Sequence, residues 1–293
     1  MREMEAETRS ITRATASPPS APRPELLAGT LLIDAHVHCH EGVDPAAFLG
    51  HAARNLAAAA AAEGLRPAAG WLLFTEMAGD HTFTALREGA RELPGWRLIP
   101  TDEAVSLLAR GAGDFPLVLV AGRQIVTGEG LEVLALCAPG PFADGQELAA
   151  SVAAVREAGG LAVLPWGFGK WWGARGKALV HFLEQAAPGT VFLGDNRGRP
   201  APVAAPRPFA LAAERGILSL PGSDPLPLAA ERDAVGRYGF VVEGAVDPAR
   251  PAAGILRLLQ GLERQPRTFG RRQTLAPFLA RQIAMQWRKR RAA

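Results

Sequence analysis

Strand-length apolar runs alternate with alanine- and leucine-rich stretches of helical length along most of this chain. The first pair is representative, because residues 31–35 are a short apolar run and residues 45–62 follow as a helix that Asp44 can cap. Such alternation is the pattern of repeated strand–helix units around a parallel sheet. We therefore expect an α/β fold in which strands and helices alternate around a barrel.

Residues 71–137 depart from this alternation, because the predicted elements there are all strands. The predicted strands are residues 31–35, 71–75, 96–100, 117–120, 122–126, 131–137, 161–164, 190–193, 217–220 and 240–243. The predicted helices are residues 45–62, 145–158, 177–185, 208–215 and 251–262. Residues 122–126 and 131–137 flank the turn sequence Thr127-Gly-Glu-Gly130, which favours a hairpin between them.

The length of 293 residues, of which 48% are hydrophobic, suits one barrel domain, since such domains commonly contain about 250 residues. We expect a disordered tail over residues 1–29, the barrel over residues 30–262 and a basic helical extension over residues 263–293. The tail lacks the apolar stretch of a signal peptide, and no apolar run approaches the roughly 20 residues that span a bilayer. Two cysteines are too few for a disulfide framework. These features indicate a cytoplasmic protein.

Positive charge is concentrated at the C-terminal end of the chain. Residues 262–293 contain nine Arg or Lys and one Glu, so the remaining residues carry a net charge of about −5 within the overall +3. Apolar residues recur at helical spacing in the same segment, namely Leu275, Phe278, Leu279, Ile283 and Trp287. We expect a helix that packs on the body and has a solvated basic end. The alternative is contact with nucleic acid or with an anionic membrane.

Polar residues follow several of the predicted strands, where barrels of this kind carry their functional groups. They are Asp34, His36, His38, Glu76, Gln124, Asp195, Asn196 and Asp224. Side chains two positions apart on an extended strand face the same side, so His36 and His38 can converge on one metal ion. Asp34 is expected on the same face, where its carboxylate could orient an imidazole or accept a bond from a neighbouring loop.

The segment Leu32-Ile-Asp-Ala-His-Val-His38 resembles the opening motif of the polymerase-and-histidinol-phosphatase (PHP) family of metal-dependent phosphoesterases. Later segments resemble further motifs of that family in the same order: Phe74-Thr-Glu76, Val120-Ala-Gly-Arg-Gln124, Gly159-Gly-Leu-Ala-Val163 and Gly222-Ser-Asp224. The resemblance implies a distorted (β/α)7 TIM-like barrel that binds up to three divalent ions and hydrolyses phosphoesters. Opening motifs of the amidohydrolase superfamily are similar to the first of these segments.

Several positions depart from the family's pattern. Met77 stands where the second motif continues with a histidine, and Gln124 stands where the third brings a glutamate. Pro165-Trp166 and Leu226 replace two later histidines. The resemblance then leaves His36, His38 and Asp224 as metal ligands, with Glu76 as an acidic equivalent. This set could hold one zinc, manganese or iron ion, or none.

Gln124 and two loops could contact a substrate. In residues 165–176, Trp166 could stack on a ring, and Lys170 and Arg175 could bind phosphate or carboxylate. In residues 194–200, Asn196, Arg197 and Arg199 could bind an anion, and Asp195 could act as a general base. The alternatives are a loop whose aromatic rings cover the barrel mouth and a turn with solvated arginines.

The leading hypothesis is a divergent PHP-like hydrolase for a small phosphorylated or anionic substrate. In it His36, His38 and Asp224 hold the ion, and Glu76 or Asp195 transfers protons. A second hypothesis is a barrel that has lost catalysis and binds a ligand or a partner. A third is an amidohydrolase acting on a C–N bond, which would need later histidines that this chain lacks at the expected strand ends.

Overall fold

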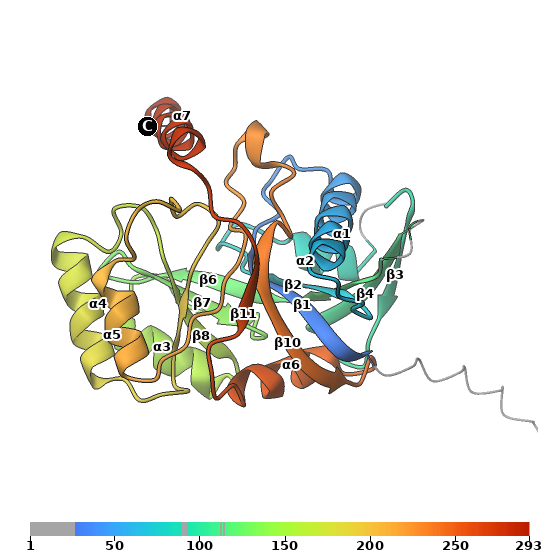
Figure 1. Ribbon diagram of the computed structural model, residues 1–293, viewed down its shortest axis with the longest axis horizontal. Helices are drawn as coiled ribbons and strands as arrows, with labels where there is room; N and C mark the ends of the chain where they lie inside the picture. The colour runs from blue at the N-terminus through green and yellow to red at the C-terminus, as the bar shows by residue number, and fades with distance from the viewer. Residues whose placement is uncertain (1–26, 90–92, 112, 114, 293) are drawn as a thin grey trace, which may run out of the picture.

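A computed structural model describes residues 27–89, 93–111, 113 and 115–292 (Figure 1). The strands are β1 (Leu27–Val37), β2 (Gly70–Phe74), β3 (Trp96–Pro100), β4 (Ser106–Gly111), β5 (Leu117–Val120), β6 (Gly122–Val126), β7 (Glu132–Leu136), β8 (Leu161–Pro165), β9 (Phe192–Gly194), β10 (Tyr238–Val246) and β11 (Arg267–Gly270). The helices are α1 (Pro45–Ala62), α2 (Thr82–Arg87), α3 (Leu148–Glu157), α4 (Gly173–Gln185), α5 (Arg207–Glu214), α6 (Pro251–Gln260) and α7 (Leu275–Ala292), with a short 3-10 turn at Ala229–Glu231.

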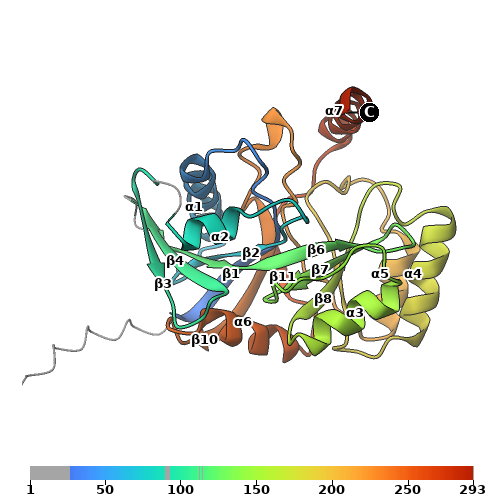
Figure 2. The same ribbon diagram turned by 180° about the vertical axis from the view of Figure 1, so that it is seen from behind.

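The first sheet has seven strands in the order β11-β10-β1-β2-β5-β4-β3. Its centre is parallel, because β1 pairs with β2 and β2 pairs with β5 in the same direction. Both flanks are antiparallel, and β10 runs against β1 from the Leu27–Val246 pair to the Ile33–Phe240 pair. Helices α1 and α2 cover one face of this sheet through a fully apolar cluster that includes Leu49 of α1 (Figures 1 and 2).

The second sheet has four strands in the order β6-β7-β8-β9. Strands β6 and β7 form an antiparallel hairpin, and β8 and β9 are parallel. Helices α3, α4 and α5 lie on its outer side (Figure 2). Its inner side packs against the first sheet, where Leu134 and Val163 share an apolar cluster with Ile33. Helix α6 adds Ile255 to this cluster at the end of the molecule where β1 begins.

Isolated bridges connect the two sheets. Glu76 pairs with Arg123, Leu193 pairs with Ser219, and Asn196 pairs with Gly222. The segment 219–224 then reaches β1, because the Ala35 amide donates to the Pro221 carbonyl over 3.3 Å. The ends of β1 and β9 therefore meet the segment that carries Asp224, and the end of β2 meets β6.

The structure does not confirm the closed barrel expected from the sequence, since its strands form two sheets in a mixed α/β fold. The predicted strand at 217–220 contributes a single bridge, at Ser219, whereas the short strand predicted at 240–243 is the nine-residue β10. Strands β4 and β11 were not predicted. Most of the predicted disordered tail lies outside the described residues, and its last part, residues 27–29, belongs to β1.

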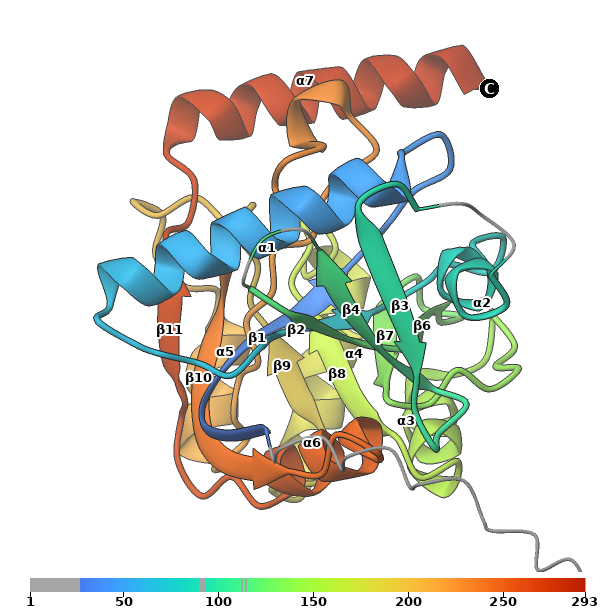
Figure 3. The same cartoon turned by 90° about the vertical axis from the view of Figure 1, so that its right-hand side faces the viewer.

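Helix α7 differs from the expectation that its apolar residues pack on the body. Only Phe278 of the five is buried, and the other four side chains are exposed. Figures 1 and 3 show α7 at the outer edge of the molecule, apart from both sheets. Helices α1 and α7 each contain 18 residues, and in the described part of the chain no helix is long and apolar enough to cross a membrane.

Candidate metal centre

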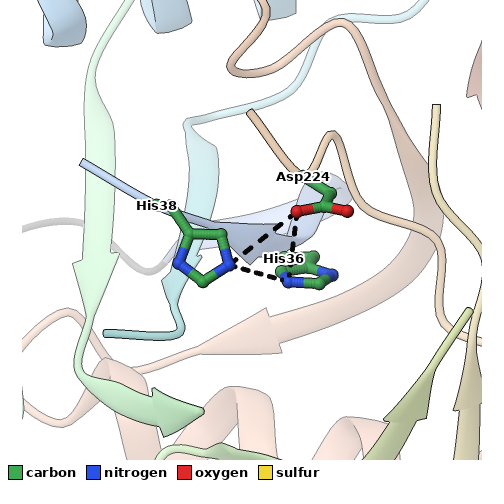
Figure 4. A group of neighbouring side chains, drawn as sticks. All are labelled: His36, His38 and Asp224. Atoms are coloured by element: carbon green, nitrogen blue, oxygen red, sulfur yellow. Dashed lines mark hydrogen bonds and ion pairs between the residues drawn. The ribbon is translucent and has the colours of Figure 1, made fainter. Parts of the chain in front are cut away.

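The imidazoles of His36 and His38 and the carboxylate of Asp224 meet at one point (Figure 4). The two Nε2 atoms are 2.9 Å apart. Asp224 Oδ1 lies 3.5 Å from Nε2 of His36 and 3.8 Å from Nε2 of His38. Both histidines are buried and Asp224 is half-buried. The structure thus brings together the three residues that the sequence analysis named as ligands.

These three atoms fit a single divalent ion. A point equidistant from them in their plane lies about 2 Å from each, which is the usual distance of zinc from nitrogen or oxygen ligands. Two neutral imidazoles and one carboxylate are donors that zinc, manganese and iron accept. Nδ1 of His38 is buried and has no hydrogen-bond partner. Within the described residues, this is the one group of at least three His, Cys, Asp or Glu side chains whose ligand atoms converge.

Asp224 is held in place by contacts with distant segments. Its backbone has a φ of +48°, a left-handed conformation that aspartate tolerates better than most residues. Its amide donates to the His36 carbonyl over 2.9 Å, and Asn196 Nδ2 donates to its Oδ2 over 2.8 Å. The same Asn196 amide group donates to the Trp166 carbonyl over 2.8 Å. These bonds fix the carboxylate against the histidine pair.

Asp34 holds the backbone around the centre rather than an imidazole. Its fully buried carboxylate accepts bonds from the Ser223 amide (2.8 Å), the Ser223 hydroxyl (2.5 Å), the Gly236 amide (2.8 Å) and the His36 amide (3.2 Å). A register irregularity between Asp34 and Val37 explains why it does not share the histidines' face. Burial raises the pKa of Asp34 to about 6, against the lowering effect of these bonds.

Electrostatic effects favour the protonation states that a metal ligand needs. Burial, and then the neighbouring charge of His36, lowers the pKa of His38 well below its ordinary value. Burial acts to raise the pKa of Asp224, but the two imidazoles and the more distant Arg281 and Lys170 together lower it. A neutral imidazole and an ionised carboxylate are the forms that bind metal.

A cavity of about 340 Å³ opens over the centre. Gln124, Trp166, Lys170 and Asn196, all expected to bind substrate, line it together with the three candidate ligands. Its wall also contains Glu132, which forms an ion pair with Lys170 and accepts a 3.2 Å bond from Gln124 Nε2. The cavity therefore places an acid–amine pair near the histidines.

The other predicted site residues have different partners. Glu76 accepts a 2.7 Å bond from the Phe83 amide at the start of α2, and burial raises its pKa. Asp195 accepts two bonds from Arg199, of 2.6 and 2.7 Å, and a third from the Tyr238 hydroxyl. Arg197 donates to the Glu231 carboxylate, and Arg175 donates to the Gly169 carbonyl.

Sequence reasoning missed several residues around the cavity. Glu132 begins strand β7 and gave no motif, and Arg281, Gln282 and Met285 belong to α7, which was treated as an extension. Arg281 is buried and its guanidinium donates to Glu231 over 2.7 Å. Arg281 is buried because the folded chain brings Glu231 beside it, and no spacing in the sequence indicates that contact.

No protein-family model and no curated protein matches the chain. Among solved structures, PsfC from Pseudomonas syringae PB-5123 is similar with a TM-score of 0.52 and 18% identity, over 90% of this chain and 99% of PsfC. A two-domain protein from Bacteroides vulgatus ATCC 8482, containing a predicted PHP-like metal-dependent phosphoesterase, is similar with a TM-score of 0.43 and 12% identity. That match covers 86% of this chain and 70% of the other. The similarity to PsfC concerns the fold.

Proposed function

We propose that this chain is a metal-dependent hydrolase that uses one divalent ion held by His36, His38 and Asp224. The observation that carries the proposal is the convergence of two Nε2 atoms and one carboxylate oxygen beside a cavity of about 340 Å³. A bound divalent ion would supply Lewis-acid chemistry, which makes water a better nucleophile and polarises a substrate oxygen. The resemblance of the surrounding segments to PHP motifs favours a phosphoester as the bond that is cleaved.

For proton transfer we favour Glu132 and Lys170 over Glu76 and Asp195. Glu132 and Lys170 border the same cavity as the candidate ligands, whereas Glu76 is bound to the Phe83 amide and Asp195 to Arg199. Glu132 can take a proton from water, and Lys170 can give one to a leaving group. Gln124 orients Glu132 by donating to its Oε1.

A small anionic substrate suits the cations on the cavity wall. Lys170 and Arg281 both line the cavity, and each is already paired with a carboxylate, Glu132 and Glu231 respectively. A phosphoryl group entering the cavity would compete with Glu132 for Lys170. Trp166 and Phe168 line the same wall and could pack against an apolar part of the substrate.

Metal analysis of the purified chain, followed by a phosphatase panel with zinc, manganese and iron, tests this function. We expect about one equivalent of metal and metal-dependent turnover. His36→Ala and Asp224→Ala should lose both, and the matched control His181→Ala, on the exposed surface of α4, should keep both. A chain that takes up none of the metals and turns over no substrate contradicts the proposal.

Two cavity residues favour a second candidate, a binding protein without catalysis. Met77 and Leu226 both line the cavity, and neither side chain can replace the imidazole that the PHP pattern has at these positions. Thermal stabilisation by phosphorylated small molecules in the absence of metal and of turnover would support this candidate.

A further inference from the structure

Helix α7 presents an exposed apolar row. Leu275, Leu279, Ile283 and Trp287 follow one another at intervals of four residues, and their exposed fractions are 47%, 56%, 60% and 59%. Residues at this spacing are neighbours on one side of a helix. The four side chains therefore form a continuous row, which we call the outer row of α7.

The opposite side of α7 attaches the helix to the body. Phe278 is 6% exposed and its ring lies 5.0 Å from that of Phe168. Arg281 is 7% exposed and bonded to Glu231, and Arg288 donates to the Pro227 carbonyl. These contacts orient the outer row away from both sheets, in keeping with the position of α7 at the edge of the molecule (Figure 3).

Basic residues follow the outer row directly. The last full turn reads Arg288-Lys-Arg-Arg291, and Arg288, Arg290 and Arg291 are exposed. No acidic residue occurs after Glu263 in the sequence. A second copy of α7 could cover the apolar row but would offer no carboxylate to this basic turn. The complement of α7 must therefore be apolar along the row and anionic at its end.

We propose that α7 binds the surface of a membrane that contains anionic lipids. The outer row would enter the boundary between headgroups and acyl chains, and the terminal arginines would bind lipid phosphates. A nucleic acid would satisfy the arginines but would leave Leu279, Ile283 and Trp287 in water. The proposal is independent of the hydrolase function, since no residue of the outer row lines the cavity.

Co-sedimentation of the full chain with lipid vesicles tests this proposal. We expect binding to phosphatidylcholine vesicles enriched in phosphatidylglycerol, much weaker binding to pure phosphatidylcholine, and a loss of binding at high salt. The triple variant Leu279→Gln/Ile283→Gln/Trp287→Gln should not bind. Arg290→Gln/Arg291→Gln should bind about fivefold more weakly for each arginine removed. Val203→Gln, at another exposed apolar residue, is the matched control and should bind like the parent chain.

Three results would overturn the proposal. The first is an absence of binding to anionic vesicles, and the second is undiminished binding by the triple variant. The third is a stable dimer of the parent chain that the triple variant dissociates, because the outer row would then be an interface between copies. Circular dichroism of each variant checks that the fold is retained, and binding of a DNA duplex in place of vesicles would assign the helix to nucleic acid.

Discussion

Two aspartates near the candidate metal centre have different tasks. Asp224 points an oxygen toward the two imidazoles, whereas Asp34 holds the Ser223 amide and hydroxyl so that the next residue faces the histidines. Gly222 permits this close approach, because a Cβ at that position would lie 2.4 Å from the His36 nitrogen. The geometry of the centre thus depends on residues that do not touch the ion.

Replacing Asp34 tests this supporting role. Asp34→Asn substitutes an NH2 group for one acceptor oxygen, so at least one buried donor among Ser223 and Gly236 loses its partner. We expect a loss of about 1–3 kcal/mol in the free energy of unfolding, measured by urea denaturation, together with weaker metal binding. The control is Asp44→Asn at the N-cap of α1, which should change neither, because asparagine caps helices about as well.

Asn196 supports the candidate metal centre by donating a hydrogen bond to the Asp224 carboxylate. Asn196→Ala removes the 2.8 Å bond to Asp224 Oδ2 and the bond to the Trp166 carbonyl. We expect the dissociation constant for zinc to rise about 10- to 100-fold, measured by isothermal titration calorimetry. Asn55→Ala is a matched control, since the Asn55 side chain also donates two bonds, both to backbone carbonyls, but lies outside the site. It should lower stability and leave the zinc affinity unchanged.

At the scale of elements, local signals predicted some parts of the fold well. Helix α1 has the predicted bounds, because Asp44 caps it, Pro45 begins it and Gly64 follows it in a left-handed conformation. The β6–β7 hairpin also forms as predicted. These elements share one property: the residues that determine them are neighbours in the sequence.

Elements determined by distant contacts were predicted less well. Strand β11 has only Phe269 buried, so its sequence has little apolar pattern, and its pairing with β10 supplies the strand structure. The pattern at 240–243 indicated a strand but carried no information on its antiparallel pairing with β1. Likewise, the apolar spacing in α7 predicted a helix, but it did not indicate that the side with Phe278 faces the body while the other apolar side chains face outward.

One buried arginine contributes to the attachment of α7, together with the contact between the rings of Phe278 and Phe168. Arg281→Ala removes its bond to Glu231, which keeps Arg197 as a partner. We expect α7 to be held less firmly on the body while the rest stays folded, so limited chymotrypsin digestion should cut faster within α7. Arg290→Ala, at an exposed position on the same helix, should leave the cleavage rate at the parent value.

On the scale of the whole molecule, the metal centre joins the beginning of the fold to its later part. His36 lies at the end of strand β1 and His38 directly follows it, whereas Asp224 lies in the segment that connects β9 to β10. Segments so far apart in the chain come together only in the folded state. The resemblance to PHP motifs predicted this convergence, but the residues alone could not place Glu132 or Arg281 at the same cavity.

A bound ion should therefore stabilise the fold. A ligand that binds only the folded chain adds about 2.7 kcal/mol to the free energy of unfolding at a concentration of 100 times its Kd. We expect the Tm to rise with zinc or manganese in differential scanning calorimetry and to fall back on addition of a chelator. His36→Ala should show no such rise, and an equal rise in that variant would place the ion elsewhere.

The isolated bridges between the two sheets have a further consequence for entry to the cavity. Hydrogen-bonded ladders run through each sheet, but single bridges at Glu76–Arg123 and Asn196–Gly222 join the sheets beside the metal centre. Each bridge is reinforced by its neighbours, since the Glu76 amide donates to the Gly122 carbonyl, the Gly222 amide donates to the Asp195 carbonyl, and the two sheets share one apolar cluster. The mouth of the cavity is therefore held by the same contacts that place Asp224, so a change at either bridge would alter both the entrance and the candidate metal centre.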